Sequence, residues 1–86
     1  MYYIYILKSK TNNKLYIGFT SDLRKRLLDH NNGKSNFTKK FIPWKLVYYE
    51  AYTSEKDARE KERQLKYHGK AWKSLVERIN YSINES

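Results

Sequence analysis

The first eighteen residues carry two apolar runs separated by a short polar turn. Residues 2–8 and 14–18 are rich in tyrosine and isoleucine, which favour strands. Thr11, Asn12 and Asn13 lie between them, and asparagine tolerates the positive φ of a tight turn. The pattern predicts a β-hairpin in which Asn12 and Asn13 form a two-residue turn and Thr11 pairs with Lys14.

Alternation along this hairpin separates its side chains into two chemically different faces. With the predicted turn, odd positions of the first strand share a face with even positions of the second. The front face then carries Tyr3, Tyr5, Leu7, Tyr16 and Gly18. The rear face carries Tyr2, Ile4, Ile6, Leu15 and Ile17. The aliphatic rear face is predicted to be core, and the front face presents the tyrosines.

A helix and a third strand are predicted next. The residues from Thr20 to Asp22 suit a helix N-cap, and the helix is expected to end near residues 31–33. Its predicted apolar stripe is Leu23, Leu27 and Leu28. Residues 33–43 are predicted to form a loop closed by Pro43, and residues 44–52 a strand. Its faces are expected to alternate regularly, with Val47, Tyr49 and Ala51 opposite Leu46, Tyr48 and Glu50.

Two helices are predicted in the C-terminal half. Ser54 and Asp57 have the spacing of a capping box, which predicts a charged helix that runs to about Tyr67. After His68 and Gly69, a shorter helix is expected over residues 70–80. Its predicted inward residues are Trp72, Leu75, Val76 and Ile79. Residues 81–86 are predicted to be a loose tail, so the elements follow the order ββαβαα in a single α+β domain of residues 1–80.

Charge is distributed unevenly along the 86 residues, which carry a formal net charge of +9. Residues 1–49 hold ten Lys and Arg against two acids, a net +8, while residues 50–86 hold eight against seven, a net +1. A one-sided excess of this kind is typical of proteins that bind polyanions. The alternative is a basic protein with no specific partner.

The residues that are missing exclude several kinds of chemistry. There is no cysteine, which excludes disulfides, thiolate nucleophiles and zinc sites built on cysteine. The apolar N-terminus is short, rich in tyrosine and without a basic leader, unlike a signal peptide. The protein is therefore expected in the cytoplasm.

The chemistry of the N-terminal half suits phosphodiester hydrolysis. A guanidinium such as Arg26 binds phosphate oxygens in a fork, and His30, one helical turn later, can relay a proton or hold a phosphate. A phenol titrates at about 10, but nearby cations favour its ionised form. Tyr5 or Tyr16 is thus a candidate general base. Mg²⁺ or Mn²⁺ needs a carboxylate, and Glu60 and Glu62 are the candidates, since Asp22 is expected to cap the helix.

The chain resembles the GIY-YIG endonuclease superfamily, in particular its small single-domain bacterial members. Residues 3–5 (Tyr-Ile-Tyr) take the place of the first motif and residues 16–18 (Tyr-Ile-Gly) are the second. Arg26 follows the motif glycine by eight residues, as the family's helix arginine does, and Glu62 is similar to its metal-binding glutamate. The resemblance covers residues 2–80.

The resemblance implies a fold with a three-stranded antiparallel sheet flanked by helices. It also implies that the protein is a DNA endonuclease. It implies one divalent metal on Glu62, tyrosines of both motifs in the site, and Arg26 stabilising the transition state. Larger relatives include homing endonucleases, some restriction enzymes and subunits that incise damaged or branched DNA, and they typically take specificity from additional domains. Structure-selective or weakly specific cutting, a possible protein partner, and a role in DNA repair are therefore expected, with RNA not excluded.

Two features depart from the family pattern. Tyr3 stands where the first motif has glycine, and Phe19 stands where some relatives have lysine. Any role of that lysine is then either lost or supplied by another residue, for which Lys14 and Lys25 are the candidates. The predicted phosphate contacts are Lys14, Lys25, Lys34, Lys39 and Lys40.

A non-catalytic nucleic-acid-binding module with the same fold is the alternative function. On that interpretation the tyrosines are structural, His30 complements the helix dipole, and Glu62 pairs with Lys66 one turn away. Binding alone does not need Glu62, because an acid repels DNA unless a cation lies between them.

Overall fold

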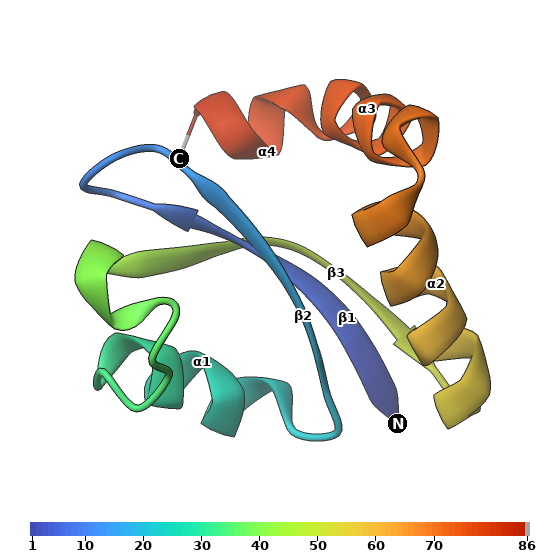
Figure 1. The fold of residues 1–86 in the computed structure, drawn as a ribbon, viewed down its shortest axis with the longest axis horizontal. Helices are drawn as coiled ribbons and strands as arrows, with labels where there is room; N and C mark the ends of the chain where they lie inside the picture. Colours follow the sequence, from blue (N-terminus) through green and yellow to red (C-terminus); the bar gives the residue numbers. More distant parts are fainter. Residues whose placement is uncertain (86) are drawn as a thin grey trace.

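Three strands form one antiparallel sheet with β1 at its centre (Figure 1). In the computed structural model, which describes residues 1–85, β1 (Tyr2–Ser9) pairs with β2 (Leu15–Thr20) on one side and with β3 (Trp44–Tyr52) on the other. The predicted α+β fold and the order ββαβαα are confirmed. A short helix, α4 (Asn80–Asn84), is added after them.

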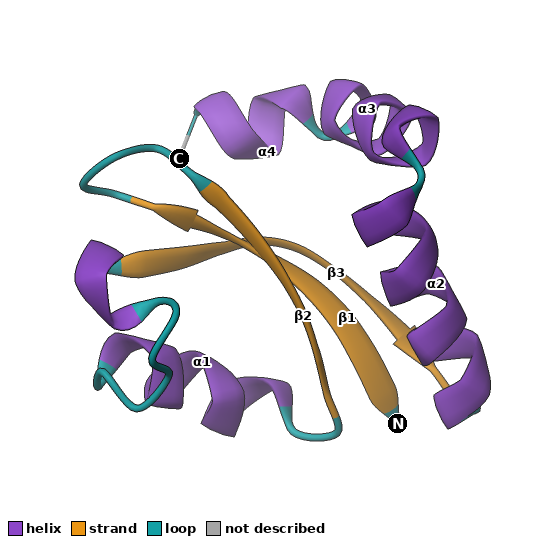
Figure 2. Ribbon diagram, in the orientation of Figure 1, coloured by secondary structure: helices purple, strands orange, loops and turns teal. Residues whose placement is uncertain are grey.

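Helices cover both faces of the sheet (Figure 2). Helix α1 (Leu23–Asn31) lies on one face, and α2 (Glu55–Tyr67) and α3 (Gly69–Arg78) lie on the other. The main core, under α2 and α3, consists of Ile4, Ile6, Ala58, Leu65 and Leu75. The second cluster, under α1, consists of Tyr5, Leu7 and Trp44, with Leu23 and Leu27 packed against it. The predicted rear face is therefore core, but the tyrosine face is covered as well.

The hairpin has a longer turn than predicted. Tyr5 pairs with Gly18 and Leu7 with Tyr16, and the Ser9 N–H donates to the Lys14 carbonyl at 2.9 Å. Residues 10–13 form the turn, and Asn13 adopts a φ of 62°. The predicted pairing of Thr11 with Lys14 was wrong by two residues. A slip of two keeps every side chain on its predicted face.

Strand β3 contains a bulge that breaks its predicted alternation. Ile6 pairs with Tyr48 while Leu7 pairs with Leu46, so Val47 is an extra residue between them. Val47 and Tyr48 consequently both pack against the main core, whereas Leu46 packs against the second cluster. The predicted grouping of Val47 with Tyr49 was wrong, because periodicity alone does not show a bulge.

The predicted helix starts are confirmed, but only one of the two predicted caps forms. The Asp22 side chain accepts a hydrogen bond from the Lys25 backbone N–H at 3.1 Å and caps α1. Leu28, predicted in the apolar stripe of α1, is 57% exposed. Ser54 is the N-cap residue of α2 but makes no capping hydrogen bond with its side chain, so the predicted capping box does not form.

The C-terminal segment is ordered against the sheet. Residues 81–84 belong to α4, Ile83 is buried, and Lys8 Nζ donates to the Ile83 carbonyl at 2.8 Å. The prediction of a loose tail was wrong for these residues, because Ile83 supplies an apolar anchor; Ser86 lies outside the described residues. No helix among residues 1–85 is both long enough and apolar enough to cross a bilayer.

Candidate functional site

Tyr5 and Gly18 face one another across β1 and β2, and the glycine makes room for the phenol. Tyr5 is only 1% exposed. A Cβ on Gly18 would lie 2.3 Å from the Tyr5 hydroxyl oxygen and 2.4 Å from the ring carbon that carries it. Gly18 is therefore a site residue whose role sequence reasoning missed. A glycine inside a β-rich run was the available signal for such a close approach.

The Tyr5 hydroxyl begins a buried chain of hydrogen bonds. It lies 2.8 Å from His30 Nε2, and His30 Nδ1 lies 2.7 Å from the Thr38 hydroxyl. Trp44 donates its indole N–H to the Thr38 carbonyl at 2.8 Å. His30 and Thr38 are both fully buried. The chain connects β1, the end of α1, the following loop and the start of β3; sequence reasoning missed Thr38, because nothing in its loop marks it as buried.

Arg26 lies one turn before His30 on α1 and interacts with the same hydroxyl. Burial raises the pKa of Tyr5 to about 12, while a hydrogen bond from Arg26 acts in the opposite direction. Partial burial lowers the pKa of the Arg26 guanidinium, but the hydrogen bond to Tyr5 and nearby negative charge outweigh it and raise that pKa. Arginine only donates, so the Tyr5 oxygen accepts from Arg26. The direction of the Tyr5–His30 hydrogen bond follows the tautomer of the neutral imidazole.

Tyr5 and His30 occupy positions suited to support rather than to substrate contact. Burial, with Arg26 nearby, lowers the pKa of His30 to about 4, although Asp29 acts in the opposite direction. The imidazole is therefore neutral at pH 7, and both of its nitrogens have protein partners. A proton relay or phosphate contact at His30 finds no support in this arrangement.

Tyr16 is the predicted site tyrosine that keeps part of its surface accessible. It is half-buried on β2, and its ring centre lies 6.5 Å from that of Tyr5 and 5.2 Å from that of His30. Its phenol is close enough for its charge to raise the pKa of Arg26. On its other side, the Phe37 ring centre is 5.7 Å away. Tyr16 therefore links the buried hydrogen-bond chain to the surface.

Glu62 approaches the same region from α2. Its charge raises the pKa of Tyr5, and its side chain is 15% exposed. Lys66 Nζ lies 3.0 Å from Glu62 Oε2 and also lines a shallow depression with Tyr16 and Phe37. The structure thus brings Tyr5, Tyr16, Arg26, His30 and Glu62 into one part of the molecule.

The Glu62 carboxylate fits a single hard cation better than an all-protein metal cage. Residues 1–85 contain no group of three or more His, Cys, Asp or Glu placed to hold a metal. Oε1 of Glu62 lies a loose 3.8 Å from Arg59 Nη1, which leaves this oxygen weakly engaged. Mg²⁺ commonly binds one or two carboxylates and completes its shell with water and phosphate oxygens.

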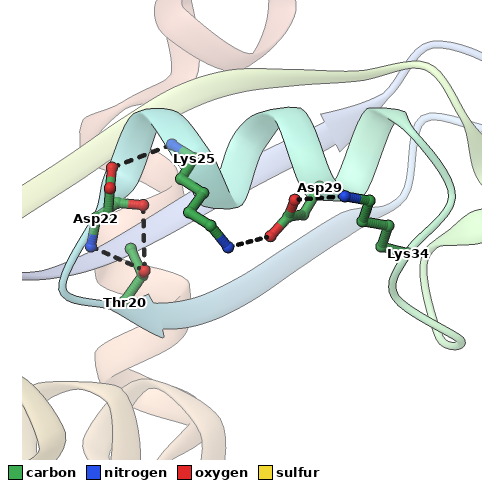
Figure 3. Close-up of polar contacts among 5 residues, drawn as sticks. All are labelled: Thr20, Asp22, Lys25, Asp29 and Lys34. Atoms are coloured by element: carbon green, nitrogen blue, oxygen red, sulfur yellow. Dashed lines mark hydrogen bonds and ion pairs between the residues drawn. The ribbon is translucent and has the colours of Figure 1, made fainter.

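Two of the predicted phosphate contacts share one acid (Figure 3). Lys25 Nζ lies 3.3 Å from Asp29 Oδ2, and Lys34 Nζ lies 3.8 Å from Asp29 Oδ1. Both lysines are well exposed, so these pairs are weak and open to competition by phosphate. Asp29 nevertheless offsets part of their charge.

The other three predicted phosphate contacts lie near the turn η1 (Lys39–Phe41). Lys39 and Lys40 belong to it, and Lys14 Nζ lies 5.3 Å from the Phe41 ring centre. All three are exposed. This group is the stronger candidate for contacts to a phosphate backbone.

The buried neutral His30 predicts a pH-dependent loss of stability. The unfolded chain protonates this imidazole near pH 6.5, whereas the folded chain does so only near pH 4. The contribution of neutral His30 to the free energy of unfolding is therefore complete above pH 6.5. It is lost as pH falls from 6.5 to 4, and the loss amounts to about 3 kcal/mol at most. Urea unfolding of wild type and His30→Gln across pH 4–8 measures it. The variant should be less stable at pH 7 and lose less stability over that range; equal losses would contradict the assignment.

Comparison with known proteins agrees with this geometry. The family model of the GIY-YIG catalytic domain matches residues 1–80. A UPF0213 protein of Clostridium perfringens is 42% identical over 67 residues, which are 77% of this chain and 71% of the relative. A UPF0213 protein of Bacillus pumilus is 38% identical over 66 residues, which are 76% of this chain and 66% of the relative.

A solved structure shares the fold. The solution NMR structure of a UPF0213 protein of Bacillus halodurans has a TM-score of 0.57 and 30% identity, and the match covers 92% of this chain and 85% of that one. The two tyrosine motifs and Arg26 all lie inside residues 1–80, which the family model matches. The family model, the similar relatives and the shared fold together show that this chain belongs to the GIY-YIG family of nuclease domains.

Proposed function

We propose that this protein is a metal-dependent DNA endonuclease that hydrolyses phosphodiester bonds at the surface between Tyr16, Arg26 and Glu62. The observation that carries the proposal is the fixed position of Arg26. A permanently charged guanidinium is hydrogen-bonded to a buried phenol and lies beside a half-buried one. A lone structural arginine has no need of two tyrosines beside it.

In the proposed reaction, water attacks the phosphorus atom and Tyr16, acting as the phenolate, accepts its proton. Tyr16 suits this role better than Tyr5, because Tyr5 is buried and its pKa is raised to about 12. The guanidinium of Arg26 donates to the phosphate oxygens on which negative charge accumulates. The P–O bond to the leaving oxygen then breaks, and this oxygen takes a proton from water, which leaves one phosphate end and one hydroxyl end. A divalent cation bound by Glu62, water and the phosphate would polarise the scissile group.

The surrounding lysines supply affinity rather than chemistry. Contacts from Lys14, Lys39 and Lys40 to the phosphate backbone would position DNA without reading its sequence. Binding should therefore weaken steeply with salt. Weak sequence specificity, a preference for branched or damaged DNA, and selection by a protein partner are consistent with a small domain of this kind.

A non-catalytic nucleic-acid-binding module is the second candidate. Lys66 and Arg59 both lie beside the Glu62 carboxylate, as they would if that glutamate were only structural. In that case DNA binding persists and cutting is absent.

Incubation with supercoiled plasmid and with flapped oligonucleotides separates the two candidates. We expect nicking in Mg²⁺ or Mn²⁺ that stops when EDTA is added. The nicking activity should elute together with the protein during purification. Tight, salt-sensitive binding with no nicking in either metal would instead establish the binding module.

Substitution of the two tyrosines tests which phenol accepts the proton. Tyr16→Phe should lower the nicking rate by about 100-fold or more while leaving stability nearly unchanged, because general-base catalysis contributes that much. Tyr5→Phe should instead cost about 1–3 kcal/mol of stability, since it leaves His30 Nε2 buried without its hydrogen-bond partner. Single-turnover nicking and urea unfolding of both variants measure the two effects. A larger rate loss for Tyr5→Phe, with its stability unchanged, would reverse the assignment.

A further inference from the structure

Phe37 is an exposed aromatic ring placed against the proposed site. It is 71% exposed, and its ring centre lies 5.7 Å from that of Tyr16 at an interplanar angle of 37°. A phenylalanine this exposed does little for the core, because most of its apolar surface stays in water. The second cluster does not include it.

The residue after Phe37 fixes its position. Thr38 is fully buried; its hydroxyl is hydrogen-bonded to His30, and its carbonyl accepts from the Trp44 indole. These are the same contacts that hold the Tyr5 hydroxyl and the end of α1. The ring is thus presented to solvent from a backbone anchored to the site.

The sequence around Phe37 is rich in lysine, and one further lysine from α2 lies close to it in the structure. From His30 to Tyr49 the sequence contains four lysines and no acidic residue. Lys66 of α2 lines the same depression as Tyr16 and Phe37, and the depression has an apolar wall formed by Leu15 and Ile17. An apolar wall with a cation beside it complements a nucleotide, which joins a flat base to a charged phosphate.

We propose that Phe37 stacks an unpaired DNA base next to the phosphate held at Arg26 and Tyr16. The proposal rests on the proposed function and names its substrate class: DNA with an unpaired nucleotide at the cleavage point, such as a flap, loop or frayed end. A base inside a duplex is stacked between its neighbours and cannot lie on a protein ring. An unstacked base can, and base–aromatic stacking of this kind is insensitive to sequence.

A fluorescence measurement in EDTA tests the inference without requiring cleavage. The probe is an oligonucleotide with 2-aminopurine in a short flap, compared with the same base in a perfect duplex. We expect wild type to quench the flap probe, and Phe37→Leu to abolish the quenching and weaken flap binding by roughly tenfold, with duplex binding unchanged. Phe37→Trp should retain both. Tyr81→Leu, which removes another exposed ring far along the chain on α4, should behave as wild type.

The outcomes for stacking and for nuclease activity are distinguishable. Equal flap binding by wild type and Phe37→Leu, or an equal loss on flap and duplex, overturns the stacking proposal even if wild type nicks DNA. Phe37-dependent quenching by a protein that cuts nothing supports the stacking site and rejects the proposed nuclease. Thermal melting confirms that Phe37→Leu is folded, as its exposure leads us to expect.

Discussion

Replacing Arg26 with alanine is expected to lower the nicking rate by about 100- to 1,000-fold, the loss typical when one preorganised donor to a charged transition state is removed. The guanidinium is held by the Tyr5 hydroxyl and stays charged at every accessible pH. Because the guanidinium already contacts Tyr5, less of its positioning has to be organised during the reaction. Arg26→Lys keeps the charge but loses the forked geometry, so it should recover only part of the rate.

Arg24→Ala is the matched control for Arg26→Ala. Arg24 lies on the same helix and is exposed, and it lines a depression with Tyr3 and Leu23 away from the Tyr5 hydroxyl. Its loss removes one positive charge and should reduce binding slightly with little effect on the rate at saturating DNA. Equal rate losses in the two variants would show that Arg26 contributes only general charge.

Gly18→Ala is expected to reduce both stability and nicking. The added methyl group would meet the Tyr5 hydroxyl oxygen at 2.3 Å, far inside contact distance. Tyr5 cannot swing aside freely, because its ring is buried and its hydroxyl is bonded to His30. Overpacking of this kind costs about 1–3 kcal/mol. Displacement of the phenol also moves the acceptor that holds Arg26, so the nicking rate should fall at least tenfold in molecules that remain folded.

Gly69→Ala controls for loss of glycine flexibility. Its added methyl group would meet nothing within 4 Å, and alanine is the better helix former, so stability should hold or rise slightly. Urea unfolding and single-turnover nicking of both variants give the comparison. A Gly18→Ala protein as stable and active as wild type would show that Tyr5 is not tightly held.

Sequence patterning predicted the elements well where local signals are strong. The third strand was placed at its observed bounds, and the cap at Asp22 forms as expected. The hairpin faces were correct although the register was not, because a slip of two residues conserves the side-chain alternation. The bulge at Val47 and the docking of Ile83 depend on contacts with distant residues, which local patterns do not contain.

The sequence predicted which residues form the candidate site but not which of them are buried. Hairpin alternation put Tyr5 and Tyr16 on one face, yet it says nothing of what covers that face. Helix α1 buries Tyr5 and His30 against the sheet while Tyr16 stays half-exposed. The difference between a supporting phenol and an accessible one is therefore a tertiary property. Local sequence patterns do not predict the position of Glu62 relative to Tyr5 either, because that position depends on how α2 packs.

Metal dependence at Glu62 is the most direct test of whether this chain is a nuclease. The measurement is the plasmid nicking rate as Mn²⁺ is titrated, for wild type, Glu62→Gln and Glu60→Gln. Glu60 is the matched control, because it is an exposed glutamate on the same helix that pairs with Arg63. We predict that Glu60→Gln follows wild type and that Glu62→Gln shows no nicking at Mn²⁺ concentrations that saturate wild type. Identical titration curves for all three proteins would contradict a metal site at Glu62 and, with it, the proposed reaction.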